Sequence, residues 1–305
     1  MAYRLKRTRP LGEEVRRRYR QQLSAAINGL AAAKHSDTAA HTSRKHIKKA
    51  RALLDAVAGE APVAEARWEL TIANRALGVV SDAYRVIPVV ADLRGVDRER
   101  APGASLDRLR AALIARAAAI EQHASAADGH RKVIRLLVSA RSRAESWDLG
   151  GVTPSTIIDA IANAHRRAKR SRRHAIDRPA SASYHRWRKR TKAEWYLFRL
   201  VADHTGRRVV HDQNRLAALD ACLGHLHDVD VLAAIIARER LLDREESARL
   251  LAVLRQYAHE QRRRARVLSV TLDDPRREVK RRMAAVWGMP AARPSSVESS
   301  CRHAA

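Results

Sequence analysis

Histidine, arginine and lysine recur with the same spacing, H-x-x-R-K-x-x-K, at two places in the chain. The two motifs consist of His41, Arg44, Lys45 and Lys48 and of His185, Arg188, Lys189 and Lys192. At about 100° per residue on an α-helix, the four side chains of each motif share one sector of the helix surface. Arginine binds phosphate oxygens bidentately and lysine binds them as a point charge. The motif therefore predicts two cationic helix faces suited to a phosphate-rich anion.

The residues around the first motif fit the same pattern. Lys49 and Arg51 flank the cationic sector, and Ile47, Leu53 and Leu54 lie on the opposite side. Acidic residues four positions away are few, so the like charges repel one another by a few tenths of a kcal/mol per pair. A charged helix face is most often only solvated, which is the simpler interpretation. Its repetition in both halves favours a bound anion that relieves the repulsion.

A second shared pattern, L-G-x-x-x-D, follows each basic motif. It comprises Leu77, Gly78 and Asp82 in the first half and Leu223, Gly224 and Asp228 in the second. The basic motifs are offset by 144 residues and these later motifs by 146, in the same order. The repetition predicts an internal duplication of the chain into two helical halves of about 145 residues. We place the first half at 1–147, a linker at 148–156, the second half at 157–288 and a disordered tail at 289–305.

The composition favours helix throughout and an anionic partner. The chain has 305 residues, with 60 Lys and Arg against 33 Asp and Glu, which gives a formal net charge of +27. Such a surplus attracts polyanions. Glycine and proline are sparse and aromatic residues make up only 4%, while alanine, arginine and leucine are abundant, so we expect an all-α protein. Helical periodicity predicts helices over 11–34, 38–57, 63–88, 105–123, 129–147, 155–173, 183–203, 209–226, 244–269 and 274–287.

The sequence also sets expectations about the compartment. Cys222 and Cys301 are far apart, which favours a reducing environment over a disulfide framework. No secretory signal and no apolar run near the roughly 20 residues of a membrane span are visible. We therefore expect a soluble, cytoplasmic protein, with Cys222 as a packed thiol.

Cationic helices precede both motifs and enlarge the candidate site. Arg16 and Arg20 lie upstream of the first motif, and Arg166, Lys169 and Arg170 lie upstream of the second. If each helix packs antiparallel to its neighbour, two cationic faces converge in each half and together line a long positive channel. The candidate anion-binding residues are therefore Arg16, Arg20, His41, Arg44, Lys45, Lys48, Lys49, Arg166, Lys169, Arg170, His185, Arg188, Lys189 and Lys192.

The sequence offers three kinds of function for this channel. Base-reading helices and exposed aromatic residues for base stacking are not evident, which favours a polyanion bound through its backbone alone. A general nucleoid or RNA-binding protein is the main alternative. A metal-dependent phosphohydrolase is a further one, since His225, His227 and Asp228 offer three ligands, but the other ligands that such enzymes need cannot be identified. We expect no metal and no cofactor, and we expect Asp82 and Asp228 to orient neighbouring cations or to cap a helix.

Each half contains the basic motif followed by the L-G-x-x-x-D motif, and in this order the chain resembles the CHAD family, the conserved histidine α-helical domain. The resemblance extends from about Tyr3 to Trp287. It implies two pseudo-symmetric helical bundles around a basic channel that binds inorganic polyphosphate. It implies that the eight basic-motif residues face this ligand and that Arg16, Arg20, Arg166 and Arg170 join them. Ser81 stands where many members have arginine before the aspartate of the first half.

The resemblance also bears on activity and location. Some members carry an additional triphosphate tunnel domain with an E-x-E-x-K signature, which does not occur in this chain. We therefore expect no enzymatic activity. The resemblance further implies recruitment to cytoplasmic polyphosphate granules.

Overall fold

The computed structural model describes residues 3–6, 8–32, 37–97, 99–126, 129–201 and 207–289 of the chain. All regular secondary structure in these residues is helical, which confirms the predicted all-α class. The α-helices are α1 (Leu11–Ala32), α2 (Asp37–Ala56), α3 (Ala64–Arg85), α4 (Ile87–Asp92), α5 (Gly103–Ala126), α6 (Gly129–Arg143), α7 (Pro154–Asp177), α8 (Ser181–Leu200), α9 (Arg207–Arg238), α10 (Arg244–Val270) and α11 (Arg276–Val286). Two short 3₁₀ turns, η1 (Leu93–Gly95) and η2 (Ala144–Ser146), follow α4 and α6.

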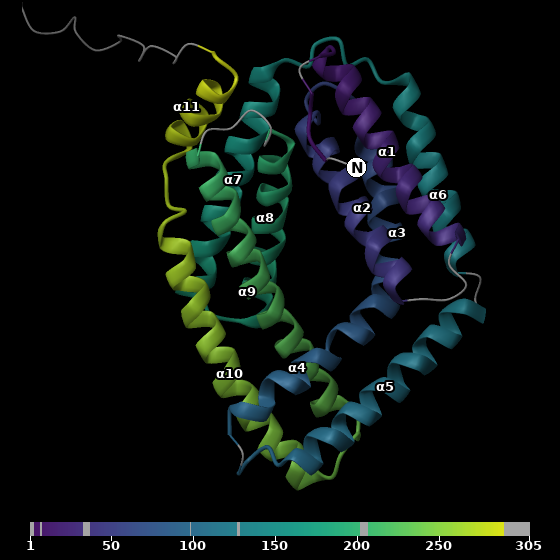
Figure 1. The fold of residues 1–305 in the computed structure, drawn as a ribbon, viewed down its shortest axis with the longest axis vertical. Coiled ribbons are helices and arrows are strands. Elements are labelled where there is room, and N and C mark those ends of the chain that lie inside the picture. Colours follow the sequence, from purple (N-terminus) through teal and green to yellow (C-terminus); the bar gives the residue numbers. More distant parts are fainter. Residues whose placement is uncertain are drawn as a thin grey trace, which may run out of the picture.

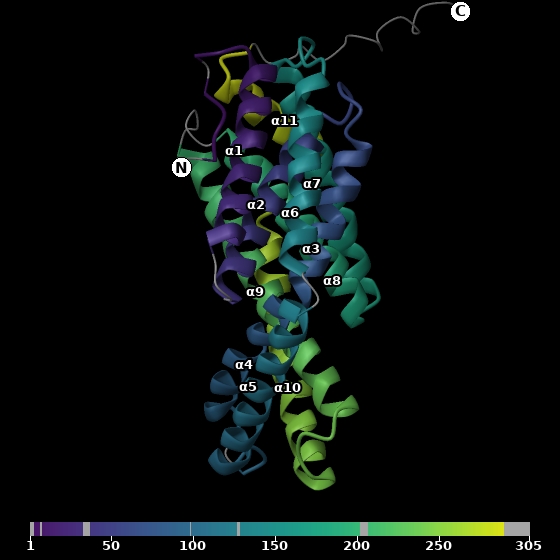
Figure 2. The same cartoon turned by 90° about the vertical axis from the view of Figure 1, so that its right-hand side faces the viewer.

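The helices form two groups that stand side by side and meet again at one end of the molecule. Helices α1, α2, α3 and α6 make one group, and α7, α8, α9, α10 and α11 make the other (Figure 1). Helices α4 and α5 extend from the first group and lie beside the far ends of α9 and α10 (Figure 2). The helices α2 and α8, which carry the two basic motifs, contact each other directly. The predicted duplication is compatible with this arrangement and stays a prediction.

Each of the two hydrophobic cores draws on both halves of the chain. One core packs Leu53 and Leu54 of α2 together with Leu197 of α8. The other packs Leu109 of α5 together with Leu232 of α9. Because both cores cross the predicted boundary, burial of apolar surface holds the two halves in a fixed relation. The scaffold can therefore position charges from both halves in one site.

The N-terminal segment adds a polar tie between the two motif helices. The Leu5 amide donates to the Leu200 carbonyl at the end of α8, at 2.8 Å. The Tyr3 hydroxyl donates to the Lys49 carbonyl of α2 at 3.0 Å. The Tyr3 ring also meets the Tyr196 ring edge to face, with centroids 6.0 Å apart. This segment therefore fixes the seam between α2 and α8.

The predicted linker, residues 148–156, covers the connection between η2 and α7 together with the first turn of α7, and its role as a boundary between two halves stays a prediction. The Thr153 side chain caps α7 by accepting from the Thr156 amide, and Pro154 occupies the first turn, where its missing N–H costs nothing. The start of α1 packs tightly against this connection, because a Cβ at Gly12 would lie 2.1 Å from the Leu149 carbonyl oxygen. Only glycine permits that approach.

Some predicted boundaries were wrong. The helix expected to end at Leu226 continues to Arg238 as α9, because Val229 and Leu232 extend its buried stripe past the charged residues. The helix expected to reach Pro88 ends at Arg85, and Pro88 instead lies in the first turn of α4. Met289, where the predicted tail begins, still packs against the first core. Residues 290–305, with Cys301, and the predicted helix ends at Lys34 and Asp203 lie outside the described residues.

The Cys222 side chain is a packed thiol, as the sequence predicted. Trp187 is 1% exposed and Cys222 is buried, so both belong to the core. Within the part of the chain that the structure describes, no helix combines the length and apolar character needed to cross a bilayer.

A buried polar pair joins α7 to α8. Glu194 Oε1 lies 2.7 Å from His165 Nδ1, and the Asp274 carbonyl lies 2.8 Å from Nε2 of the same ring. Although burial lowers the pKa of His165, its hydrogen bond and attraction to Glu194 raise it above its ordinary value. Since both ring nitrogens face acceptors, His165 is held as an imidazolium.

We predict that Glu194→Ala lowers the free energy of unfolding by about 3 kcal/mol, because it leaves a buried imidazolium without its carboxylate. Urea denaturation followed by circular dichroism measures the change. The matched control is Glu245→Ala, whose carboxylate pairs with Arg249 on the surface of α10 and whose loss costs less than about 1 kcal/mol. Equal stabilities of the two variants would contradict a structural role for the pair.

Candidate anion-binding site

Five cations from both halves gather where α2 meets α8. Arg44 and Lys48 come from α2, Arg188 and Lys192 from α8, and Arg85 from the end of α3. The charges of the other four all lower the pKa of Lys48, which shows that they share one neighbourhood. We call these five residues the central cluster. The structure thus brings together the two arginines and the two final lysines of the predicted motifs.

Arg44 is held in place by the second motif of its own half. Its guanidinium donates to both carboxylate oxygens of Asp82, at 2.7 and 3.4 Å. A Cβ at Gly78 would lie 3.4 Å from Arg44 Nη2, so glycine there leaves room for the guanidinium against α3. Although burial raises the pKa of Asp82, its hydrogen bond to Arg44 lowers it below the ordinary value. Asp82 therefore orients a cation, as the sequence predicted.

The L-G-x-x-x-D motif of the second half makes different contacts. Gly224 again faces the arginine of its basic motif, with its ideal Cβ position 3.6 Å from Arg188 Nε. Asp228, however, accepts a hydrogen bond from Arg85 of the first half at 2.6 Å. Arg85 also lies 3.8 Å from Asp82, so it bridges the acidic residues of both halves. Asp228 orients a cation as predicted, but that cation belongs to the other half.

The final lysines of the two basic motifs differ in whether they have a carboxylate partner, and so do the arginines. Lys192 Nζ donates to Asp220 at 2.6 Å, whereas no described residue pairs with its counterpart Lys48. Among the described residues Arg188 likewise has no hydrogen bond or ion pair, and its Nε is buried without an acceptor. Among the described residues, these two cations at the centre of the site therefore have no carboxylate within hydrogen-bond or ion-pair distance, although Asp228, Asp220 and Asp82 lie near enough to attract Arg188.

Lys48 shows the electrostatic consequence most clearly. Burial, followed by the charges of Arg44, Lys192 and Arg188, lowers the pKa of Lys48 to about 7. Burial and the charge of Arg85 lower the pKa of Arg188 as well. An anion placed between these side chains would relieve both effects, because it replaces lost water and opposes the repulsion.

The motif histidines border the central cluster as neutral rings. His185 packs against His227, with ring centroids 4.3 Å apart. Burial, followed by the charge of Lys189, lowers the pKa of His185 to about 4, and burial with the charge of Arg188 lowers that of His227 to about 3. Burial and the charge of Lys45 lower the pKa of His41. Nδ1 of His185 is buried without a hydrogen-bond partner.

Two cationic flanks extend the central cluster along the seam. On one flank Lys49 lies over the Tyr3 ring at 5.7 Å, and Arg199 lies over Trp195 at 4.8 Å. On the other flank, burial and the charges of Arg75 and Arg51 lower the pKa of Lys189. Lys45 and Lys189 themselves are exposed. The exposed lysine of each motif is thus free to meet a ligand that extends beyond the centre.

Three of the upstream cations predicted for the site are held by partners outside the central cluster. The Arg16 guanidinium donates to the Trp147 carbonyl, and Arg20 pairs with Glu145 at 2.9 Å. Lys169 donates to the Asp273 carbonyl at 2.7 Å. Arg166 and Arg170 are exposed on α7. Helix α1 instead turns Gln22 toward α2, where its Oε1 lies 2.9 Å from Nδ1 of His46.

Arg85 and Asp220 are the site residues that the sequence did not single out. Arg85 follows Asp82 by three positions, but its partner Asp228 is 143 residues away. Asp220 lies one turn before Gly224 and belongs to neither motif. No local pattern marks either residue, because both act through contacts between distant segments.

The three potential metal ligands of the second half do not converge. His225 Nε2 lies 3.0 Å from the Tyr257 hydroxyl, His227 stacks on His185, and Asp228 pairs with Arg85. Within the described ranges, no group of three or more histidine, cysteine, aspartate or glutamate side chains is arranged to hold a metal ion.

Comparisons with known proteins agree on one family and one fold. The model of the CHAD domain family matches residues 14–237. The solved structure of PptA from Streptomyces chartreusis superposes with a TM-score of 0.62 at 16% identity, covering 87% of this chain and 99% of that one. The CHAD domain from the plant Ricinus communis superposes with a TM-score of 0.60 at 17% identity, covering 95% of this chain and 98% of that one. No curated protein matches the chain.

Because Lys192 has a carboxylate partner and Lys48 has none among the described residues, we predict that replacing each of them changes the free energy of unfolding in opposite directions. Lys48→Met removes a crowded, unpaired charge, so we expect the free energy of unfolding to rise by about 1 kcal/mol at pH 7 and low salt. Lys192→Met leaves the buried Asp220 carboxylate without its partner, so we expect a loss of about 2 kcal/mol. Urea titrations of both variants measure these changes. Destabilisation by Lys48→Met would show that Lys48 has a structural partner.

Proposed function

Because the chain belongs to the CHAD domain family, we propose that it binds inorganic polyphosphate at the central cluster without turning it over. The observation that carries the proposal is the pair of unpaired cations, Lys48 and Arg188, at the seam between α2 and α8. A folded chain retains such charges at a cost in stability. Binding of an anion recovers that cost.

The paired cations fit the same ligand. Asp82 fixes the Arg44 guanidinium, and Asp220 fixes the Lys192 ammonium. These carboxylates reduce the positive charge but hold the side chains in place, so less side-chain entropy is lost on binding. Arginine and lysine together then meet successive phosphate groups, each of which carries negative charge.

The two flanks suggest the path of a long polymer. Lys49 and Arg199 lie on one side of the seam, and Lys189 lies with Arg75 on the other. We propose that the polymer crosses the central cluster between these flanks. The cluster and the two flanks together would then form the predicted basic channel. The same binding would recruit the protein to cytoplasmic granules rich in polyphosphate.

The two tryptophans of α8 favour polyphosphate over single-stranded nucleic acid as the ligand at the seam. Trp187 is buried, and the Trp195 ring is covered by the cations of Arg199 and Lys192, at 4.8 and 5.8 Å from its centroid. Neither ring is presented as a free platform for base stacking. The cationic surface alone retains general attraction to nucleic acid, which a competition experiment separates from specific binding.

We predict that long-chain polyphosphate displaces duplex DNA from the protein at equal phosphate concentration, with little displacement in the converse direction. The combined variant Lys45→Ala and Lys189→Ala should weaken polyphosphate binding by roughly tenfold, because two exposed phosphate contacts are lost. Fluorescence anisotropy at fixed salt measures both effects, and circular dichroism confirms that helicity is unchanged.

The matched control combines Lys132→Ala with Arg255→Ala, which removes the same charge from exposed positions on α6 and α10. It should change the affinity by less than twofold. Displacement of polyphosphate by DNA, or equal losses in the two variants, would contradict the proposal. Release of orthophosphate from the polymer by the purified protein would contradict binding without turnover.

A further inference from the structure

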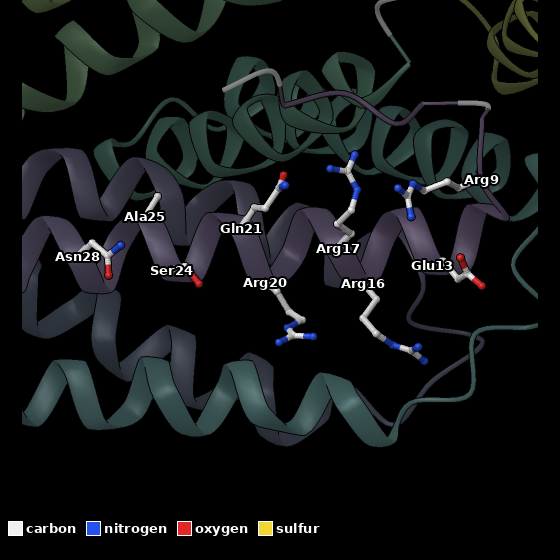
Figure 3. Close-up of a pocket in the computed structure, with 9 residues that line it drawn as sticks. All are labelled: Arg9, Glu13, Arg16, Arg17, Arg20, Gln21, Ser24, Ala25 and Asn28. Atoms are coloured by element: carbon white, nitrogen blue, oxygen red, sulfur yellow. The ribbon is translucent and has the colours of Figure 1, made fainter.

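A second cationic feature lies on α1, apart from the central cluster. A cavity of about 530 Å³ is lined by Arg9, Glu13, Arg16, Arg17, Arg20, Gln21, Ser24, Ala25 and Asn28 (Figure 3). We call it the arginine groove. Four arginines line it against one glutamate, and the neighbouring carboxylates of Glu14 and Glu145, which pair with Arg17 and Arg20, reduce this positive charge without cancelling it. Arg17 and Gln21 extend to one side of the helix, and Arg16 and Arg20 extend to the other (Figure 3).

The arginine groove faces away from the seam between the motif helices. The buried side of α1 carries Tyr19, Gln22 and Leu23, and Gln22 reaches His46 of α2. At 100° per residue, Arg17 and Ser24 lie on the opposite side of the helix. A ligand bound in the arginine groove therefore lies on the side of α1 that faces away from the central cluster.

Three of the four arginines are held by partners at the rim of the groove. Arg17 donates twice to Glu14 at 2.8 Å, and Glu14 is itself fully buried and accepts from the Lys6 amide at 3.2 Å. Arg16 donates to the Trp147 carbonyl, and its Nε is buried without an acceptor. Arg20 pairs with Glu145 at 2.9 Å. These contacts orient the guanidinium groups in advance of a ligand, which lowers the entropic cost of binding.

We infer that the arginine groove is a separate binding site for a short condensed phosphate of two or three linked phosphoryl groups. Arg16 and Arg20 lie about 6 Å apart along the helix axis on the same side of α1 (Figure 3), so a single phosphate ion cannot contact both guanidinium groups fully, whereas a short linear anion can extend along this row. Serine, alanine and asparagine line the rest of the groove and offer no aromatic platform for a base. This site goes beyond the proposed polymer path, because it lies on another face.

Titration calorimetry with tripolyphosphate at low salt tests the inference. The starting protein is the full chain with Lys48→Gln and Arg188→Gln, which disables the central cluster. We expect it to retain one tripolyphosphate site. Adding Arg9→Glu and Arg20→Glu should weaken that remaining site at least tenfold, because two groove cations become anions. Adding Arg255→Glu and Arg263→Glu on the exposed face of α10 instead gives the same charge change and should leave it within about threefold.

The outcomes separate the two proposals. The inference is overturned if the starting protein binds no tripolyphosphate, or if the groove and control pairs weaken binding equally. Binding of orthophosphate as tightly as tripolyphosphate would also overturn it, because the site would then not require linked phosphates. The proposed function is tested by a different measurement, the affinity of the Lys48→Gln and Arg188→Gln variant for long polyphosphate. An unchanged affinity in that variant would contradict the proposed function.

Discussion

The uncompensated positive charge at the seam of α2 and α8 is the constraint on which the functional part of the structure depends. Lys48 and Arg188 are partly withdrawn from water and have no carboxylate partner among the described residues. Burial and the neighbouring cations bring the pKa of Lys48 down to about 7. The surrounding contacts hold these charges close together despite their repulsion.

Three kinds of contact supply that restraint. Two hydrophobic cores cross between the halves and fix the separation of α2 and α8. The N-terminal segment ties the end of α8 to α2 through Leu5 and Tyr3. Asp82 and Asp228 then orient Arg44 and Arg85, and the pair of Arg85 with Asp228 connects the halves beside the unpaired cations. The acidic residues thus position the cations that surround Lys48 without reaching Lys48 itself.

The sequence predicted the parts of this site that depend on local spacing. Because side chains four residues apart share a helix face, spacing alone assigns Arg44 with Lys48 to one surface and Arg188 with Lys192 to another. The start of α7 was also predicted to within one residue, since the sequence placed it at 155 and α7 begins at Pro154. Continuation of α9 past Leu226 was not, since buried apolar contacts outweigh the charged residues there.

Features that depend on distant segments could not be predicted. Arg85 enters the site through a partner 143 residues away, and nothing near it in the sequence marks that role. Arg16 and Arg20 were predicted to line the basic channel, but the rotation of α1 directs them to Trp147 and Glu145. A helical pattern defines which residues share a face, whereas packing against other helices decides what that face meets.

Proton uptake on polyphosphate binding tests the central claim most directly. With a pKa of about 7, Lys48 is about half protonated at pH 7 in the free protein, and a bound anion raises that pKa. Calorimetry at pH 7 in two buffers of different ionisation enthalpy should therefore show that Lys48 takes up at most about half a proton per bound segment. The uptake should fall in Lys48→Met. Binding with no proton uptake, or with uptake unchanged in Lys48→Met, would contradict the claim that the polymer neutralises the unpaired charge at the seam.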